Sequence, residues 1–152
     1  MRYLLDFLYE SRIKDKDLET VKNLVSKYYK IPKDVLDNVR IEYKKLPEIW
    51  AVFVRKLGNY IQVIYRPLAK ILGLYDPVKK EISIDYSLPY YHKIKTLIHE
   101  YVHAAQDYLG DIYKKSREKI EKEARLVTNY LFKIYNQVSQ KYPSFLNYLI
   151  QV

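Results

Sequence analysis

The sequence lacks cysteine altogether and has only one methionine, three glycines and three histidines among its 152 residues. The absence of cysteine excludes disulfides, thiolate zinc ligands and a cysteine nucleophile, so any bound metal must take nitrogen and oxygen ligands. No apolar run approaches the roughly twenty residues of a membrane span, and Asp6 and Glu10 interrupt the N-terminal segment, unlike a secretory signal. We therefore expect a cytoplasmic protein with no membrane partner.

Basic residues outnumber acidic ones by 27 to 18, which gives a formal net charge of +9. Such a charge favours anionic partners such as nucleic acid. The lysines and arginines are nevertheless scattered between Lys14 and Lys141, and no recognised nucleic-acid motif accompanies them. Nucleic acid is therefore not an expected partner.

The 18 tyrosines, many lysines and few glycines are typical of a thermophilic source.

Hydrophobic periodicity predicts a mixed α+β chain. Apolar residues at three- and four-residue spacing predict an amphipathic helix over 17–29, and a second, longer helix over 116–140 with Ser116 as its cap. Strands are predicted at 39–43, 50–54, 60–65, 71–75 and 81–85. Gly58-Asn59 and the segment 76–79 mark the turns of two hairpins. Another helix starts near Ser87 and Pro89 and ends at Gly110.

The length of 152 residues predicts one domain. Within it we expect a helix-and-sheet part over 1–88, a pair of packed helices over 89–140, and an apolar tail over 143–152. The sheet is expected to be small and mostly antiparallel. The short connection from Gly110 to Lys115 makes the two helices antiparallel neighbours.

The most informative segment is His99-Glu100-Tyr101-Val102-His103, which has the pattern H-E-x-x-H. On a helix, residues four apart share one face, so both imidazoles can bind one Zn²⁺ while Glu100 faces the open position of the metal. The helix also has a broad apolar face, separate from the histidines, formed by Ile94, Leu97, Ile98, Tyr101, Val102 and Ala105. Two surface histidines on an ordinary helix are the alternative.

Catalytic zinc commonly takes three protein ligands and a water, so a third donor is expected, and a carboxylate on the next helix is the best candidate. Relative to the apolar stripe through Ile120, Glu123 lies at about 60° on one side and Glu121 at about 100° on the other. Glu118 points away at about 160°. Glu123 borders the packed face most closely, and the small residue Ala124 beside it allows a close helix approach.

With these residues in place, the chain resembles zincin metallopeptidases of the gluzincin branch. His99-Glu100-x-x-His103 matches their motif, and Glu123-Ala124 stands twenty residues after His103, like the third-ligand pair of thermolysin-like enzymes. The segment Glu121 to Ala124 is also similar to the glutamate helix of ImmA/IrrE-type peptidases. The small size is most like that of archaeal minigluzincins.

The resemblance implies a single zincin-like domain with an N-terminal backing helix, in which His99, His103 and Glu123 bind Zn²⁺ and Glu100 acts as the general base. It also implies that the strand 81–85 forms the edge of the cleft and pairs with an extended peptide. Thermolysin-like enzymes have an aspartate four residues after the ligand glutamate, where Val127 stands here, so support for the first histidine is expected from elsewhere, with Thr128 and Asn129 as candidates.

The resemblance further implies a zymogen-like latent form, in which the tail 143–152 blocks the cleft of its own or a neighbouring molecule, as a monomer or a self-inhibited dimer. The expected function is therefore a zinc endopeptidase acting on peptides or proteins. A regulatory protease of narrow specificity is one alternative. The other is a basic nucleic-acid or protein-binding module whose metal site is structural or vestigial.

Overall fold

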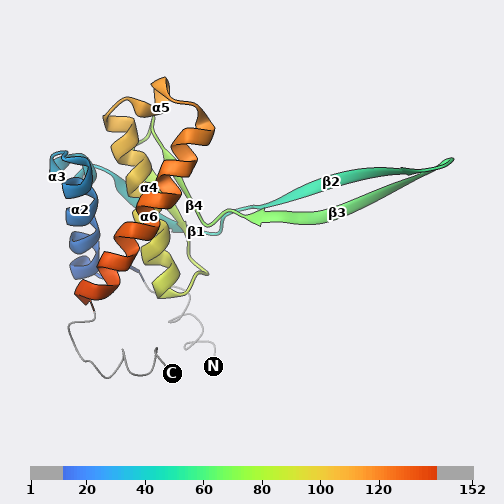
Figure 1. The fold of residues 1–152 in the computed structure, drawn as a ribbon. Coiled ribbons are helices and arrows are strands. Elements are labelled where there is room, and N and C mark those ends of the chain that lie inside the picture. The colour runs from blue at the N-terminus through green and yellow to red at the C-terminus, as the bar shows by residue number, and fades with distance from the viewer. Residues whose placement is uncertain (1–11, 140–152) are drawn as a thin grey trace, which may run out of the picture.

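The computed structural model describes residues 12–139, with the backbone alone described for 48–57 and 60–70. Five helices lie within this part of the chain: α2 (Asp15–Tyr29), α3 (Lys33–Asp37), α4 (Tyr90–Tyr108), α5 (Asp111–Lys114) and α6 (Arg117–Ser139). The strands are β1 (Arg40–Lys44), β2 (Glu48–Leu57), β3 (Tyr60–Lys70), β4 (Gly73–Asp76) and β5 (Glu81–Asp85) (Figure 1). The apolar tail expected to regulate the protein, 143–152, lies outside the described residues.

The strands form two separate sheets. β1, β5 and β4 make a three-stranded sheet in that order, whereas β2 and β3 pair only with each other in an antiparallel hairpin with its turn at Gly58 and Asn59. β5 pairs in parallel with β1 and in antiparallel fashion with β4. The three-stranded sheet is thus mixed, so the expectation of a mostly antiparallel sheet holds only in part.

β5 is the central strand, and the prediction that 81–85 forms the edge of the cleft is wrong. Its residues Ile82 and Ile84 are fully buried in the same core as the apolar residues of α4. β5 also has a hydrogen-bonded strand on each side. β4 is an edge strand of this sheet, since it pairs with β5 and with no other strand of the described chain, and both β4 and β5 contact the histidine helix α4. The alternating pattern of 81–85 suited an edge, but the sequence contained no signal for the parallel partner β1.

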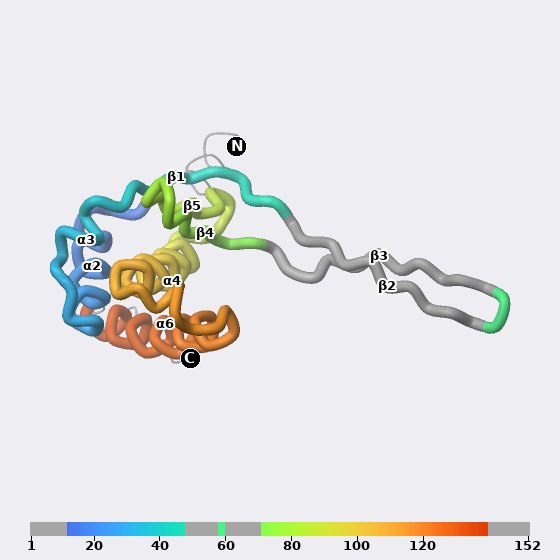
Figure 2. Tube along the Cα trace, turned by 90° about the horizontal axis from the view of Figure 1, so that it is seen from above, coloured from blue at the N-terminus to red at the C-terminus, as the bar shows by residue number. Residues whose placement is uncertain are grey.

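Helix α4 lies in the middle of the domain. Figure 2 shows it between the three-stranded sheet on one side and α6 on the other, with α2 alongside. The predicted apolar face of α4 forms the centre of the core, because every one of its residues is at most 1% exposed: Ile94, Leu97, Ile98, Tyr101, Val102 and Ala105. The sequence prediction for this face is confirmed.

The ends of the two long C-terminal helices follow from local signals. Pro89 takes the N-cap position of α4, and Gly110, after its last turn, has φ 79°, a left-handed conformation that glycine adopts without steric cost. The predicted cap of α6 is also confirmed, because the Oγ of Ser116 accepts a hydrogen bond from the backbone N–H of Lys119 at 3.3 Å. The end of α4 before Gly110 and the start of α6 after Ser116 leave only a short connection between the two helices, so they lie side by side.

The helices of the described residues include none that is both long and apolar enough to cross a membrane.

Helix α6 supplies buried residues to the same core as α4: Ala124, Val127, Leu131 and Phe132. The observed class is therefore α+β, with a single small domain built around α4.

Candidate metal centre

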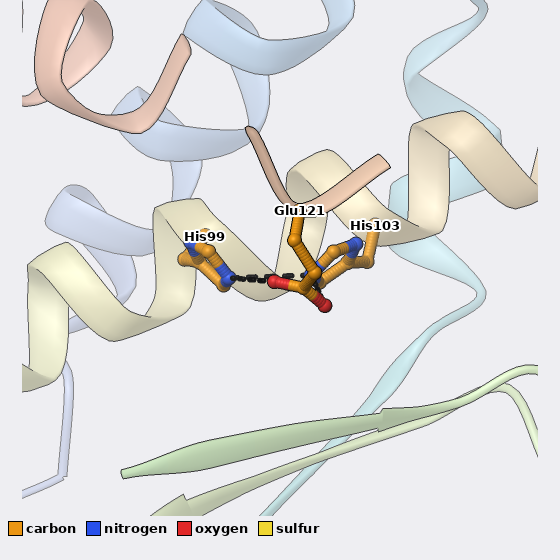
Figure 3. Close-up of side chains that lie close together, drawn as sticks. All are labelled: His99, His103 and Glu121. Atoms are coloured by element: carbon orange, nitrogen blue, oxygen red, sulfur yellow. Dashed lines mark hydrogen bonds and ion pairs between the residues drawn. The ribbon is translucent and has the colours of Figure 1, made fainter. Parts of the chain in front are cut away.

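His99 and His103 lie one turn apart on α4 and point toward Glu121 of α6 (Figure 3). The Nε2 atoms of the two histidines are 3.2 Å apart. The carboxylate of Glu121 lies 3.7 Å from Nε2 of His99 and 3.4 Å from Nε2 of His103. One ligand atom from each residue falls within 4.8 Å of the others, so the three side chains could hold a metal ion.

The spacing of these atoms suits a tetrahedral ion. Bonds of about 2.0–2.1 Å at a tetrahedral angle place two ligand atoms about 3.3 Å apart. The 3.2 Å between the two Nε2 atoms and the 3.4 Å from Nε2 of His103 to Oε1 of Glu121 are close to that value, whereas Nε2 of His99 lies 3.7 Å from the other carboxylate oxygen, Oε2. Two imidazoles and a carboxylate are the donor set that catalytic zinc sites use.

The ring of His103 is held by a buried glutamine. Nδ1 of His103 lies 2.8 Å from Oε1 of Gln106, one turn further along α4. The amide nitrogen of Gln106 donates to the carbonyl of Ile120 at 3.2 Å and to the carboxylate of Glu123 at 2.6 Å. Because both of these partners accept, Oε1 must face the histidine, and Nδ1 of His103 carries the hydrogen. Nε2 is then the nitrogen with the free lone pair.

The ring of His99 has a similar but longer contact. Its Nδ1 lies 3.4 Å from Oγ1 of Thr128, one of the two residues predicted to support it. Burial, followed by the neighbouring His103, lowers the pKa of His99. A lowered pKa favours the neutral imidazole, which is the form that binds a metal.

Glu100 is a buried carboxyl group beside the three candidate ligands. It is 5% exposed, and burial, with a smaller contribution from the charge of Glu121, raises the pKa of Glu100 to about 8. Gly73, the first residue of β4, lies against it, because a Cβ atom at position 73 would come within 3.3 Å of Oε1 of Glu100. The strand can approach the carboxyl group this closely only because residue 73 has no side chain.

The site opens into a cleft of about 520 Å³. A second hollow of about 350 Å³ shares Gly73, His99 and Glu100 with it and continues along α4 past Thr96 toward His92. Strand β4 contributes Gly73, Leu74 and Tyr75 to the cleft, and α6 contributes Arg117, Ile120 and Glu121. The ligand group and Glu100 therefore lie in the wall of a groove that continues on both sides.

Glu123, the predicted third ligand, does not lie with the histidines. Its carboxylate accepts from Gln106 and from the hydroxyl of Tyr29 on α2 at 3.4 Å, and it lies 3.8 Å from Nζ of Lys115. The stripe of α6 packs against both α4 and α2, and Glu123 lies on the side that faces α2. Glu121, on the other side, faces the histidines. The prediction chose Glu123 because it lies closer to the centre of the apolar stripe, but Glu121 is the carboxylate that lies beside the two histidines.

Two further residues take no part in the group. Glu118 is exposed, as its angle predicted. His92, the third histidine of the chain, lines the second hollow together with His99 but is not one of the three grouped side chains. The sequence interpretation missed Gln106 and Gly73 altogether. Gln106 could have been found, since it stands three residues after His103 and so shares its helix face.

No protein-family model, no curated protein and no solved structure matches this chain. The residues of the groove and the H-E-x-x-H motif are therefore the features that indicate a function.

Proposed function

We propose that the protein is a zinc-dependent peptidase in which His99, His103 and Glu121 hold the metal. The observation that carries the proposal is the meeting of these three ligand side chains beside the buried Glu100, in the wall of an open groove. A structural zinc normally has four protein ligands. The group found among the described residues has three, which leaves one position for water and substrate.

A bound zinc ion supplies Lewis acidity, which polarises a peptide carbonyl and lowers the pKa of water. Glu100 accepts a proton from the water that attacks the carbonyl carbon, and it later gives a proton to the amine that leaves. Its burial supports this role, since a raised pKa brings the carboxyl group close to the working pH of a general base. Glu100 is a proton carrier and not a ligand.

The substrate is an extended peptide that lies along β4. The outer edge of this strand borders the cleft, and its backbone groups can pair with an added strand. Gly73 keeps the edge close to Glu100, so a peptide paired with β4 passes directly over the ligand group. The groove continues on both sides of the site, which suits cleavage within a chain rather than at its end.

The test combines metal content with cleavage of an unstructured protein. The wild-type protein should contain one zinc per chain and should cleave in a way that a chelator stops and zinc restores. Glu100→Gln should keep the zinc and lose cleavage, whereas His103→Ala should lose both. Full cleavage by Glu100→Gln, or a wild-type protein that takes up no zinc, would refute the proposal.

A further inference from the structure

The buried Gln106 and the partly exposed Glu123 form a chain of hydrogen bonds that ends on a metal-ligand candidate. Gln106 is completely buried, and its amide group is shared among three partners: His103, Ile120 and Glu123. A buried side-chain amide that bonds to an imidazole at one end and a carboxylate at the other can adopt only one of its two flipped orientations. The carboxylate therefore determines which atom of the amide meets the histidine.

The orientation of the amide has a chemical consequence at His103. If the amide were reversed, its nitrogen would face Nδ1, and the imidazole would have to carry its hydrogen on Nε2. A ring protonated on Nε2 cannot donate that lone pair to a metal. The hydrogen bond at the second nitrogen thus decides whether a histidine is ready to bind.

We propose that Glu123 and Gln106 are positioning residues that hold His103 in the tautomer with hydrogen on Nδ1, and so set the affinity of the site for zinc. This inference rests on the proposed metal site but assigns Glu123 a different role from that of a ligand. Glu123 is itself held in place, because the Tyr29 hydroxyl and the Lys115 ammonium group approach its two carboxylate oxygens. The chain of contacts thus links the end of α2, the start of α6 and the histidine.

The contrast with His99 supports this division of roles. Thr128 meets His99 with one hydroxyl group, at 3.4 Å, and a hydroxyl can either donate or accept. Gln106 meets His103 at 2.8 Å, with an oxygen that can only accept. His103 is therefore the ligand whose tautomer the protein fixes more firmly.

The experiment measures zinc affinity by competition with a chromophoric chelator, and the tautomer of His103 by the ¹⁵N shifts of its ring in the zinc-free protein. Gln106→Leu should weaken zinc binding about 10- to 100-fold, as changes beside metal ligands commonly do. It should also move the ring from a single tautomer to a mixture. Glu118→Leu, at an exposed position of α6, the helix that carries Glu123, is the control and should change neither quantity.

An exchange of the two side chains separates positioning from packing. Gln106→Glu alone places two carboxylates together and should weaken zinc binding. Adding Glu123→Gln restores a donor opposite the new carboxylate, which still accepts from Nδ1. The carbonyl of Ile120 loses its donor in both variants, so the double variant should recover only part of the lost zinc affinity but should bind zinc more tightly than Gln106→Glu alone. Comparison of Gln106→Glu with the double variant tests the positioning role even if Gln106→Leu does not fold.

The outcomes distinguish this inference from the proposed function. If the wild-type protein binds zinc and the ¹⁵N shifts and affinity are unchanged in Gln106→Leu, the positioning role is refuted and the metal site stands. A double variant no better than Gln106→Glu alone also refutes it. A wild-type protein that binds no zinc refutes both ideas together.

Discussion

Replacing Gly73 by alanine should damage both the fold and the site, because it adds one methyl group where β4 meets α4. The new Cβ would lie 2.5 Å from Cγ2 of Thr96 and 3.2 Å from Cγ of Glu100. Carbon atoms normally stay about 3.5–4.0 Å apart, so the strand or the helix must shift by about 1 Å. Gly73 is not among the residues with positive φ, so the effect comes from space alone and not from backbone strain.

The expected cost follows from this displacement. Overpacking of a well-filled interior costs about 1–3 kcal/mol, which is a large part of the stability of a small domain. The same shift moves the edge of the groove relative to Glu100, and a misplacement of about 1 Å near reacting groups can lower the rate about 100-fold. Urea denaturation measures the first effect, and cleavage of an unstructured protein by the zinc-loaded variant measures the second.

A second substitution tests the cause. Thr96→Ser removes the clashing Cγ2 atom and should cost about 1 kcal/mol on its own. The double variant should be more stable than the sum of the single changes predicts, by at least about 0.5 kcal/mol. Cleavage should recover only in part, since the contact with Glu100 remains. Strict additivity, or a fully stable and active Gly73→Ala protein, would refute the account of Gly73 as a close-approach residue.

Three further predictions concern the ligands and the groove. Glu121→Gln should weaken zinc binding by more than about 100-fold, because it changes a proposed ligand. Glu123→Gln should weaken zinc binding by no more than about 100-fold, because Glu123 acts only through Gln106. Equal losses of zinc affinity in the chelator competition would contradict the assignment of Glu121 as the ligand. Zinc at about 100 times its dissociation constant should raise the free energy of unfolding by about 2.7 kcal/mol, and His103→Ala should abolish this gain in calorimetry. Arg117→Glu should lower kcat/KM for peptides with acidic residues about fivefold, as expected for one surface charge contact, while the exposed control Lys119→Glu should not.

The sequence predicted the elements of the fold well wherever the local pattern was strong. The helix α4, its buried face and its end at Gly110 were all predicted, because an apolar stripe and a capping residue are local signals. The sheet order was not, since the pairing of β1 with β5 joins segments about forty residues apart and depends on the rest of the fold. The cleft edge was assigned to the wrong strand for this reason.

The two histidines and Glu100 were predicted from the motif because their relative positions depend only on the geometry of one helix. Their partners Thr128 and Gln106 illustrate the limit of that approach. Thr128 was one of two candidates proposed from sequence. Its contact with His99 could not be predicted from the sequence, because it depends on how α6 packs on α4. The spacing of Gln106 from His103 places both on one helix face, but its burial and its hydrogen bond to Glu123 depend on how α6 packs against α4.

The choice between Glu121 and Glu123 shows most clearly what an angular argument lacks. The two residues lie on opposite flanks of one apolar stripe, about 160° apart. Such a stripe can be shared by two neighbours, and here α6 packs on α4 with one part of it and on α2 with another. The residue nearest the stripe centre then points into the junction of three helices, where Glu123 meets Tyr29 and Gln106. The proposed zinc site must remain open to substrate, so its carboxylate has to come from the outer flank, where the stripe ends and the groove begins, and Glu121 lies at that position.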